Sequence, residues 1–421
     1  MELVNVYFRY WIYAILTILL VLITIFLYRP TIKSIPEPIL FNLPSAYCSS
    51  SSIHANCFFG RSLCYNISSS QWETSTFPFY NWSGVSLRSR GSLFRDSPAH
   101  AACNEPFLPK LNRNPVMDAY WINGTCVLSC IWVYVFGHIF LEMMLPAWLA
   151  MKNIAERLKL SDQNITYVLD NRFGAGLAQS SFTLLSHRPI LAFNELIAEA
   201  NQQSKSHLCF DKLIIGYRLQ SSLEYAHNVA HLENGDLARY RDYIKVLHGF
   251  PTRVNMSEDV CIALIAQRGA DRRIVPESEK EIIEILHERT NCTVKVASFD
   301  TISISEQVRL VSEASVLVHV SGSGAHHFIW LPDRGASLLI VHPKMPLNAL
   351  GNGGLGGGGL ILNEFLCWKH PTILCVTAGA KSLGEDSRSD IQVDTYSFSN
   401  ALDMIKLWQN RGRFDPRDPT E

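Results

Sequence analysis

An apolar stretch near the N-terminus of the chain limits how the rest of the sequence can be arranged. From Tyr10 to Tyr28 no residue is charged, and only Thr17 and Thr24 interrupt an aliphatic and aromatic run. About 20 apolar residues span a bilayer as a helix, whereas a secretory signal peptide has a shorter apolar core and a small-residue cleavage site. This run ends at Arg29-Pro30. The sequence therefore predicts one transmembrane helix that is retained as a signal-anchor.

The side of the membrane on which the remaining chain lies is indicated by its N-glycosylation motifs. Basic residues flank both ends of the apolar segment, so charge does not set the orientation. Short motifs recur by chance in long chains, but every N-x-[ST] sequon here follows the apolar segment. We expect a single-pass type II protein of the Golgi or endoplasmic reticulum membrane with a glycosylated, lumenal C-terminal part. The sequons begin at Asn66, Asn81, Asn123, Asn164, Asn255 and Asn291.

The cysteine content supports the same compartment, and the net charge limits the possible partners. All 11 cysteines follow the apolar segment, and in an oxidising lumen most of them should pair. An odd number leaves at least one thiol outside these pairs. Lys and Arg number 37 against 38 Asp and Glu, so there is no electrostatic argument for a nucleic-acid partner.

Beyond an irregular, Pro- and Ser-rich segment at 31–110, apolar strand-like runs alternate with helical patterns. This alternation is typical of an α/β fold with a parallel sheet. It occurs twice, before and after a polar segment at 218–255 that resembles a linker, which predicts two Rossmann-like domains with a cleft between them. A last helix at 396–408 could pack back across the first domain. The expected strands are 165–169, 212–217, 260–266, 293–297, 316–320 and 337–341, with helices at 139–159, 190–199, 277–289 and 305–312.

Two segments that follow predicted strands of the second set could bind an anion. Ser321-Gly322-Ser323-Gly324 comes directly after the strand 316–320, and such a turn exposes backbone N–H groups at a helix start. Arg268, Arg272 and Arg273 follow the strand 260–266, and the planar guanidinium group suits phosphate. Taken alone, the glycine turn is more simply an ordinary strand-to-helix turn. The arginines could equally form a solvated turn that pairs with acidic neighbours.

A third segment could supply acid–base chemistry. His138 and Glu142 are spaced i, i+4, so on an α-helix they share one face and could act as general base. An isolated pair of this kind is more often structural. Clustered histidines invite a metal site, but none has the flanking Glu of a zinc protease. No Asp-x-Asp occurs either, so we expect chemistry without a metal or other cofactor.

The order of these motifs resembles glycosyltransferase family 61. The resemblance covers roughly residues 120–345 and includes the strand-and-turn block from Val316 to Pro332. The other segments that carry it are Phe136–Glu142, Leu184–Pro189, Cys209–Gly216, Arg268 with Arg272 and Arg273, Glu277–Leu286 and Glu306-Gln307.

The resemblance implies a GT-B-like fold and an inverting transfer of a sugar, of the GlcNAc or pentose class. The donor would be a UDP-sugar, and the acceptor a protein hydroxyl or a glycan. The arginines, the glycine turn and His326 would bind the donor diphosphate, with Glu142 or His138 as the base. The expected segments are a cytoplasmic tail (1–9), a transmembrane helix (10–28), a lumenal stem (29–110), an N-terminal acceptor domain (111–250), a C-terminal donor-binding domain (251–395) and a C-terminal helix and tail (396–421).

Two positions depart from the family pattern. The family usually has His-Gly-Ala-Gly at the turn, whereas this chain has Ser321 at the first position, and His326 stands where Thr or Ser is usual. Either a neighbouring histidine (His319 or His326) replaces the lost contact, or donor binding is altered. The alternative function is a non-catalytic protein that binds a glycan or nucleotide on a transferase fold.

Overall fold

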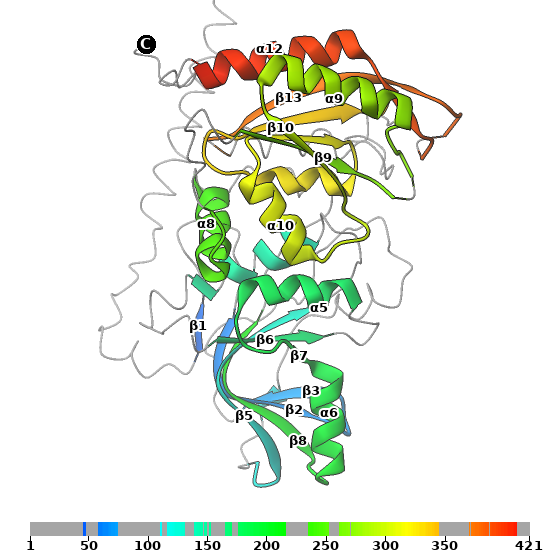
Figure 1. Cartoon of the computed structure of the whole chain (residues 1–421). Coiled ribbons are helices and arrows are strands. Elements are labelled where there is room, and N and C mark those ends of the chain that lie inside the picture. The colour runs from blue at the N-terminus through cyan, green and yellow to red at the C-terminus, as the bar shows by residue number, and fades with distance from the viewer. Residues whose placement is uncertain are drawn as a thin grey trace, which may run out of the picture. The chain divides into compact units, whose positions relative to one another are not determined.

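The computed structural model describes two β-sheets with their helices (Figure 1). The N-terminal apolar segment lies outside the described residues, and among those residues no helix is long and apolar enough to cross a membrane. The described ranges are 45–47, 58–74, 110–111, 116–130, 139–145, 147–149, 151–152, 165–170, 176–215, 235–251, 261–269, 271–344, 370, 372–386 and 388–410.

The first sheet is mixed rather than parallel. Its strand order is β4-β3-β2-β8-β5-β6-β7, with β1 paired to β2. Strands β5 to β8 run parallel, whereas β2 pairs antiparallel with β3 and β8. The strands are β1 (Ser45–Tyr47), β2 (Phe58–Asn66), β3 (Gln71–Thr74), β4 (Lys110–Leu111), β5 (Ala119–Cys130), β6 (Ile165–Asp170), β7 (Leu191–Ala192) and β8 (His207–Ile215).

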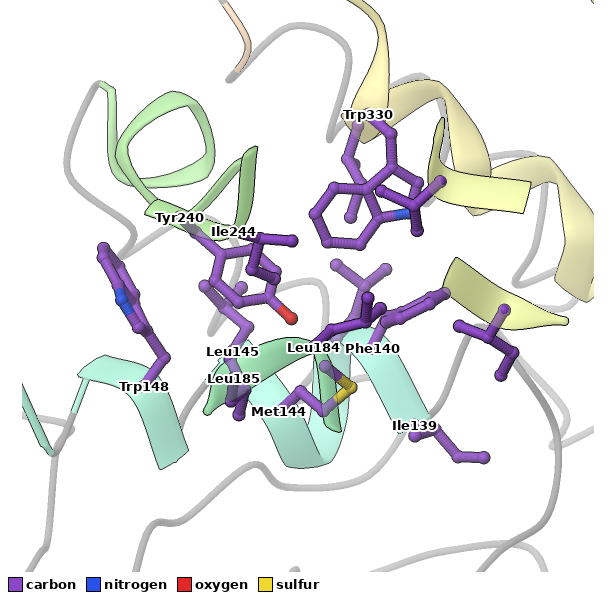
Figure 2. Close-up of a cluster of buried hydrophobic side chains, with 14 of the residues drawn as sticks. Ile139, Phe140, Met144, Leu145, Trp148, Leu184, Leu185, Tyr240, Ile244 and Trp330 are labelled. Atoms are coloured by element: carbon purple, nitrogen blue, oxygen red, sulfur yellow. The ribbon is translucent and has the colours of Figure 1, made fainter. Parts of the chain in front are cut away.

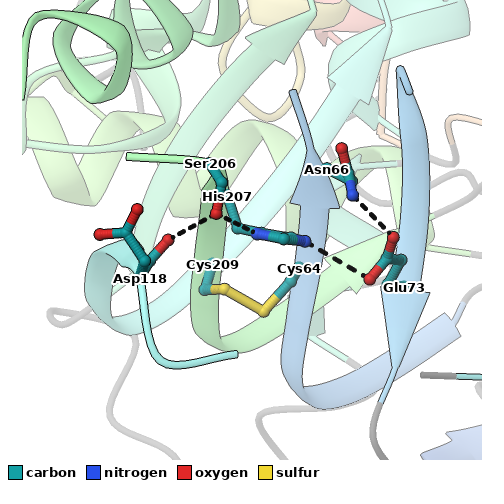
Figure 3. The surroundings of a disulfide bond; sticks show 7 residues. All are labelled: Cys64, Asn66, Glu73, Asp118, Ser206, His207 and Cys209. Atoms are coloured by element: carbon teal, nitrogen blue, oxygen red, sulfur yellow. Dashed lines mark hydrogen bonds and ion pairs between the residues drawn. A yellow bond between two sulfur atoms is a disulfide. The ribbon is translucent and has the colours of Figure 1, made fainter. Parts of the chain in front are cut away.

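Strands β2 and β3 correct the prediction of an irregular stem up to residue 110. Cys64 of β2 lies directly opposite Cys209 of β8, and the two form a disulfide. Beside this disulfide, Nε2 of His207 lies 3.4 Å from Oε2 of Glu73, and the Asn66 amide donates to Oε1 of Glu73 at 3.0 Å (Figure 3). Cys64 and Cys209 are 145 residues apart in sequence, so no local pattern could have predicted their pairing.

The second sheet is the more regular of the two. Its order is β10-β9-β11-β12-β13-β14, parallel except for β14. The prediction of a Rossmann-like second half agrees closely with these strands. They are β9 (Ile262–Gln267), β10 (Thr293–Ser298), β11 (Val316–Val320), β12 (Ala336–Val341), β13 (Leu374–Ser382) and β14 (Ile391–Val393).

Alternating residues of the second sheet enter two different cores, as expected for strands buried on both faces. Ala263 and Ile265 pack with α9 (Pro276–Thr290) and α12 (Thr395–Asn410). Leu264 and Ala266 face the other way, toward α10 (Ile304–Glu313) and the 3₁₀ helix η6 (Ser323–Trp330). Helix α12 therefore packs on the second sheet beside α9 (Figure 1), and the prediction that it crosses back over the first domain is wrong.

The core that contains α10 and η6 also includes residues from the first half of the chain. Phe140 lies on the π-helix η3 (Ile139–Met144), and its ring packs edge-to-face on Trp330, with centroids 5.1 Å apart (Figure 2). Tyr240 of α8 (Asp236–His248) packs on the same indole at 5.5 Å. The remaining helices are α5 (Gly176–Phe182), the 3₁₀ helix η5 (Thr183–Leu185) and α6 (Phe193–Gln202).

Helix α8 corrects the prediction that 218–255 is a linker. Two of its basic residues are buried: Arg241 is 1% exposed and Lys245 is 0% exposed. Arg241 donates to the Leu331 carbonyl and forms an ion pair with Asp333 at 2.7 Å. These buried charges interrupt the apolar stripe that would otherwise have indicated a core helix.

Candidate functional site

The turns after β9 and β11 meet at one edge of the second sheet. The two strands are parallel neighbours, with His319 opposite Ala266 near their carboxyl ends. In open α/β sheets, ligands bind in the crevice outside these ends. The segment Arg268–Arg272 and the turn Ser321–Gly324 therefore lie side by side.

Gly322 is required where it stands, for two separate reasons. Its backbone has φ 140° and ψ −170°, a region that only glycine readily adopts. A Cβ atom at this position would lie 2.8 Å from Nη1 of Arg268 and 2.8 Å from Nη1 of Arg272. Both guanidinium groups thus pack directly on the backbone of the turn.

The contacts of the two arginines fix their orientation. Nη1 of Arg272 donates to the Ser321 carbonyl at 3.0 Å. Nε of Arg268 donates to the Asp271 carbonyl at 2.9 Å, and its Nη2 lies 3.2 Å from the Asp271 carboxylate. Burial lowers the pKa of Arg272, and the neighbouring charge of Arg268 lowers it further. Two adjacent positive charges on one backbone turn form an arrangement suited to an anion.

Arg273, the third arginine of this segment, points elsewhere. Its side chain is 53% exposed, and Nη2 lies 2.9 Å from the Asp390 carboxylate. The structure therefore does not bring Arg273 to the glycine turn, although the sequence groups it with Arg268 and Arg272.

The side chain of Ser321 is occupied within the protein. It is 1% exposed, and its Oγ accepts a hydrogen bond from the His342 backbone N–H at 3.0 Å. Ser323 begins η6, but its side chain lies outside the description. The Gly324 carbonyl accepts a hydrogen bond from Nδ1 of His327 at 2.6 Å. Hydrogen bonds at Ser321 and at Gly324 thus hold the two ends of the turn.

Three histidines lie buried behind the turn. His326 is 5% exposed and His319 2%. Nε2 of His319 lies 2.6 Å from Oγ of Ser337, and Nε2 of His327 lies 2.8 Å from Oε1 of Gln307. Burial lowers the pKa of His319 and of His327 to about 3. Both rings are therefore neutral at physiological pH. Within the described ranges, no three His, Cys, Asp or Glu side chains are placed to hold a metal.

A pocket of about 420 Å³ opens beside the two turns. Arg268 and Gly324 line one side of it, and Ser180 of α5 contributes from the first half of the chain. Ser303 also lines it and caps α10 by accepting a hydrogen bond from the Glu306 N–H. The Arg268 side chain keeps 23% exposure, so its charge is accessible to a ligand.

The two candidate bases are only partly placed. His138 and the side chain of Glu142 lie outside the described residues. The backbone of Glu142 belongs to η3, which is a π-helix rather than an α-helix. The shared helix face of His138 and Glu142 therefore stays a prediction. Phe140 on the same π-helix contacts both Trp330 and His327 of η6, so η3 lies next to the helix that follows the turn.

Three sequons fall within the described residues. Asn123 and Asn291 are exposed, and Asn66 is half-buried. The side-chain carbonyl of Asn66 accepts hydrogen bonds from Oγ of Ser68 and the N–H of Ser69. The sequons at Asn81, Asn164 and Asn255 lie outside the description, and glycosylation of all six remains a prediction.

Some residues at this edge have no signal in the sequence. Asp300 accepts a hydrogen bond from the Gly269 N–H and lines the pocket. The carbonyl of Arg388 accepts one from the Arg272 N–H at 2.9 Å. Arg388 lies in a short polar segment between β13 and β14, where no periodic pattern or motif marks it.

Comparison with known proteins gives one family and a remote structural likeness. Residues 136–338 match the family model described as Glycosyltransferase 61. A search of curated proteins gave no match. Two solved structures of the E. coli heptosyltransferase WaaC are similar, one with ADP-2-deoxy-2-fluoro heptose and one with ADP. They are 10% and 11% identical to this chain, with TM-scores of 0.30 and 0.29, and each comparison covers 69% of this chain and 100% of WaaC.

Proposed function

Because the chain belongs to glycosyltransferase family 61, we propose that it transfers a sugar from a UDP-sugar to a protein hydroxyl or a glycan. The family makes the chain a glycosyltransferase. The UDP donor, a sugar of the GlcNAc or pentose class and inversion at the anomeric carbon are the proposed specifics. The two α/β sheets support a GT-B-like arrangement, with the donor on the second sheet and the acceptor on the first.

One observation carries the proposal: Arg268 and Arg272 pack on Gly322, a position that only glycine readily occupies, and Arg268 also lines a pocket. In sugar transfer the bond between the anomeric carbon and the diphosphate breaks, and negative charge builds up on the departing oxygen. Fixed positive charge at that place stabilises the transition state. Arg268 and Arg272 would provide it, with the backbone amides of the turn. Buried His326 would help to shape the turn.

The other half of the reaction needs a base. An acceptor hydroxyl attacks the anomeric carbon on the face opposite the diphosphate, and its proton must pass to a nearby group. We assign this role to Glu142 or His138, because η3 packs against η6 through Phe140 and Trp330. No metal or other cofactor is required in this scheme, since the arginines replace the divalent ion that an Asp-x-Asp motif would hold.

The remaining specifics concern location. We propose a type II membrane protein of the Golgi or endoplasmic reticulum, anchored by residues 10–28, with the transferase part in the lumen. The disulfides Cys64–Cys209 and Cys261–Cys292 support an oxidising compartment.

A second candidate is a pseudo-transferase that binds a nucleotide or glycan without turnover. The observation that favours it is the environment of Ser321. This side chain stands where the family usually has His, and its Oγ accepts the His342 N–H inside the protein. It therefore cannot reach a donor as a His at that position could.

The test is nucleotide binding and turnover by the full chain, purified in detergent. UDP release from a panel of UDP-sugars, with a candidate acceptor, separates a transferase from a binding protein. Titration calorimetry then compares UDP binding to wild type, Arg268→Ala and Arg268→Lys. A charge-assisted phosphate contact is worth roughly 1.5–3 kcal/mol, or about one to two decades of affinity. We expect Arg268→Ala to lose that much and Arg268→Lys to recover little, because one ammonium cannot reproduce the guanidinium fork. Equal UDP affinity for all three would overturn the assignment.

A further inference from the structure

The segment Arg388–Ile391 is hydrogen-bonded to the arginine segment through Arg388, Asp390 and Ile391. The Arg272 N–H donates to the Arg388 carbonyl at 2.9 Å, and the Ile391 N–H donates to the Arg273 carbonyl at 2.8 Å. Asp390 accepts from the Arg273 backbone N–H at 3.1 Å and pairs with its guanidinium. Arg273, which does not reach the glycine turn, thus anchors the segment that carries Arg388.

His342 ties the same segment to the glycine turn from the other side. Its Nε2 lies 3.1 Å from the Ser389 carbonyl, and its backbone N–H donates to Oγ of Ser321. His342 is 0% exposed. The segment around Arg388, the arginines after β9 and the turn after β11 therefore form one connected structure, whose geometry does not depend on a ligand.

The guanidinium of Arg388 forms no ion pair among the described residues, although, after the hydrogen bond from the Arg388 backbone N–H, its charge helps to lower the pKa of the neighbouring Asp386 carboxylate. The side chain is exposed, and its positive charge contributes to the lowered pKa of Arg272, after burial and Arg268. Among the described residues, none forms an ion pair with Arg388, whereas Arg273 pairs with Asp390 and Arg268 with Asp271. Arg388 adds a third positive charge beside Arg268 and Arg272, and an anion bound between them would reduce their mutual repulsion.

We infer that Arg388 is a third anion-binding residue of this site and contacts the diphosphate of the nucleotide-sugar donor. The inference rests on the proposed function. It adds a residue from beyond the part of the chain that matches the family, which ends at residue 338. Arg268 and Arg272 would hold the diphosphate on the side of the glycine turn, and Arg388 would cover its solvent side.

The experiment measures anion binding by the full chain in detergent, with UDP and, separately, inorganic pyrophosphate as titrants. We expect Arg388→Ala to bind both roughly three- to tenfold more weakly, because an exposed charge contributes less than a buried one. The dependence of affinity on salt should also become shallower, and Arg388→Lys should restore part of the loss. The hydrogen bonds of Arg388 in this structure use its backbone, so the melting temperature without ligand should not change.

The matched control is Arg289→Ala. Arg289 is a half-exposed arginine in the last turn of α9, paired with Asp403 of α12 and away from the carboxyl edge of the sheet. Arg289→Ala should leave the affinities for UDP and for pyrophosphate unchanged. If Arg388→Ala binds UDP and pyrophosphate like wild type, the inference is wrong. If wild type binds pyrophosphate but not UDP, the proposed function fails, while a loss of pyrophosphate binding in Arg388→Ala still supports the third arginine. If wild type binds neither, both are overturned.

Discussion

Replacing Gly322 by alanine tests the geometry of the site more directly than removing a charge. At φ 140° and ψ −170° an L-residue carries backbone strain of about 1–3 kcal/mol. The new Cβ would also lie 2.8 Å from Nη1 of Arg268 and of Arg272. Both guanidinium groups end flexible side chains, so they would move rather than unfold the protein. We therefore expect Gly322→Ala to fold with lower stability and with both arginines displaced from the turn.

The expected loss of binding follows from these displacements. If each arginine contributes about 1.5–3 kcal/mol to holding a diphosphate, weakening both contacts should lower UDP affinity by about two decades or more. Stability should fall by about 1–3 kcal/mol. Titration calorimetry of UDP and urea denaturation of the same preparations measure the two effects separately.

Gly249→Ala is the control for backbone strain. Gly249 has φ 66° at the end of α8, and a Cβ there would meet nothing within 4 Å. It should lose about 1–2 kcal/mol of stability and retain full UDP affinity. If Gly322→Ala also binds UDP like wild type, the close approach of the arginines to the turn has no part in binding, and the reasoning is refuted.

Three further predictions concern metal, glycans and pH. Transfer measured with UDP-sugars should survive chelation with little loss, and a steep loss that Mn²⁺ restores would reveal a metal site. Endoglycosidase should increase the gel mobility of the full chain expressed in a secretory host, and unchanged mobility would contradict a lumenal C-terminal part. Because the pKa of His319 and of His327 is about 3 in the folded chain but about 6.5 when unfolded, only the unfolded chain takes up these protons below pH 6.5. As the pH falls from about 6 to about 4, each histidine should therefore lower the free energy of unfolding by about 1.4 kcal/mol per pH unit. His327→Gln should show a shallower decline than wild type in urea denaturation series, and an equal slope would contradict this.

The second sheet shows where sequence patterns suffice. The strand predicted at 316–320 coincides with β11, and the helix predicted at 277–289 lies within α9. Strands that are buried on both faces are continuous apolar runs, and a helix on such a sheet has a clear 3.6-residue period. Local composition and tertiary burial agree in this part of the chain, so the local signal is reliable.

The first half shows where those patterns fail. The segment Phe58–Asn66 forms strand β2 because it pairs with β8. The Cys64–Cys209 disulfide joins the two strands across 145 residues of sequence. Helix α8 carries Arg241 and Lys245 on its buried face, and Arg241 is stabilised by Asp333 from the second half. In both cases the decisive partner is distant in sequence, so a reading of local periods assigns a stem and a linker.

The residues of the candidate site likewise fall into those that local sequence patterns predict and those that they do not. Arg268, Arg272 and the glycine turn could be predicted because each directly follows a recognisable parallel strand, and neighbouring strands bring such turns together. Arg273 was grouped with them by spacing alone, but its guanidinium turns to Asp390. Arg388 reaches the site through backbone pairing with a segment more than a hundred residues earlier, which no local pattern predicts.

The side chain at position 321 bears on turnover of the donor rather than on its binding. The features suited to holding a diphosphate are the backbone of Gly322, the guanidinium groups packed on it and the N–H groups of the turn, and none of these uses the side chain at position 321. Ser321 Oγ instead supports His342, which steadies the segment that carries Arg388. With Ser in place of the family's His, the proposed anion site keeps these features but lacks a side chain that could act on the donor. Under this reasoning UDP affinity alone cannot identify the chain as an active enzyme, and only sugar transfer to an acceptor distinguishes the transferase from the binding protein.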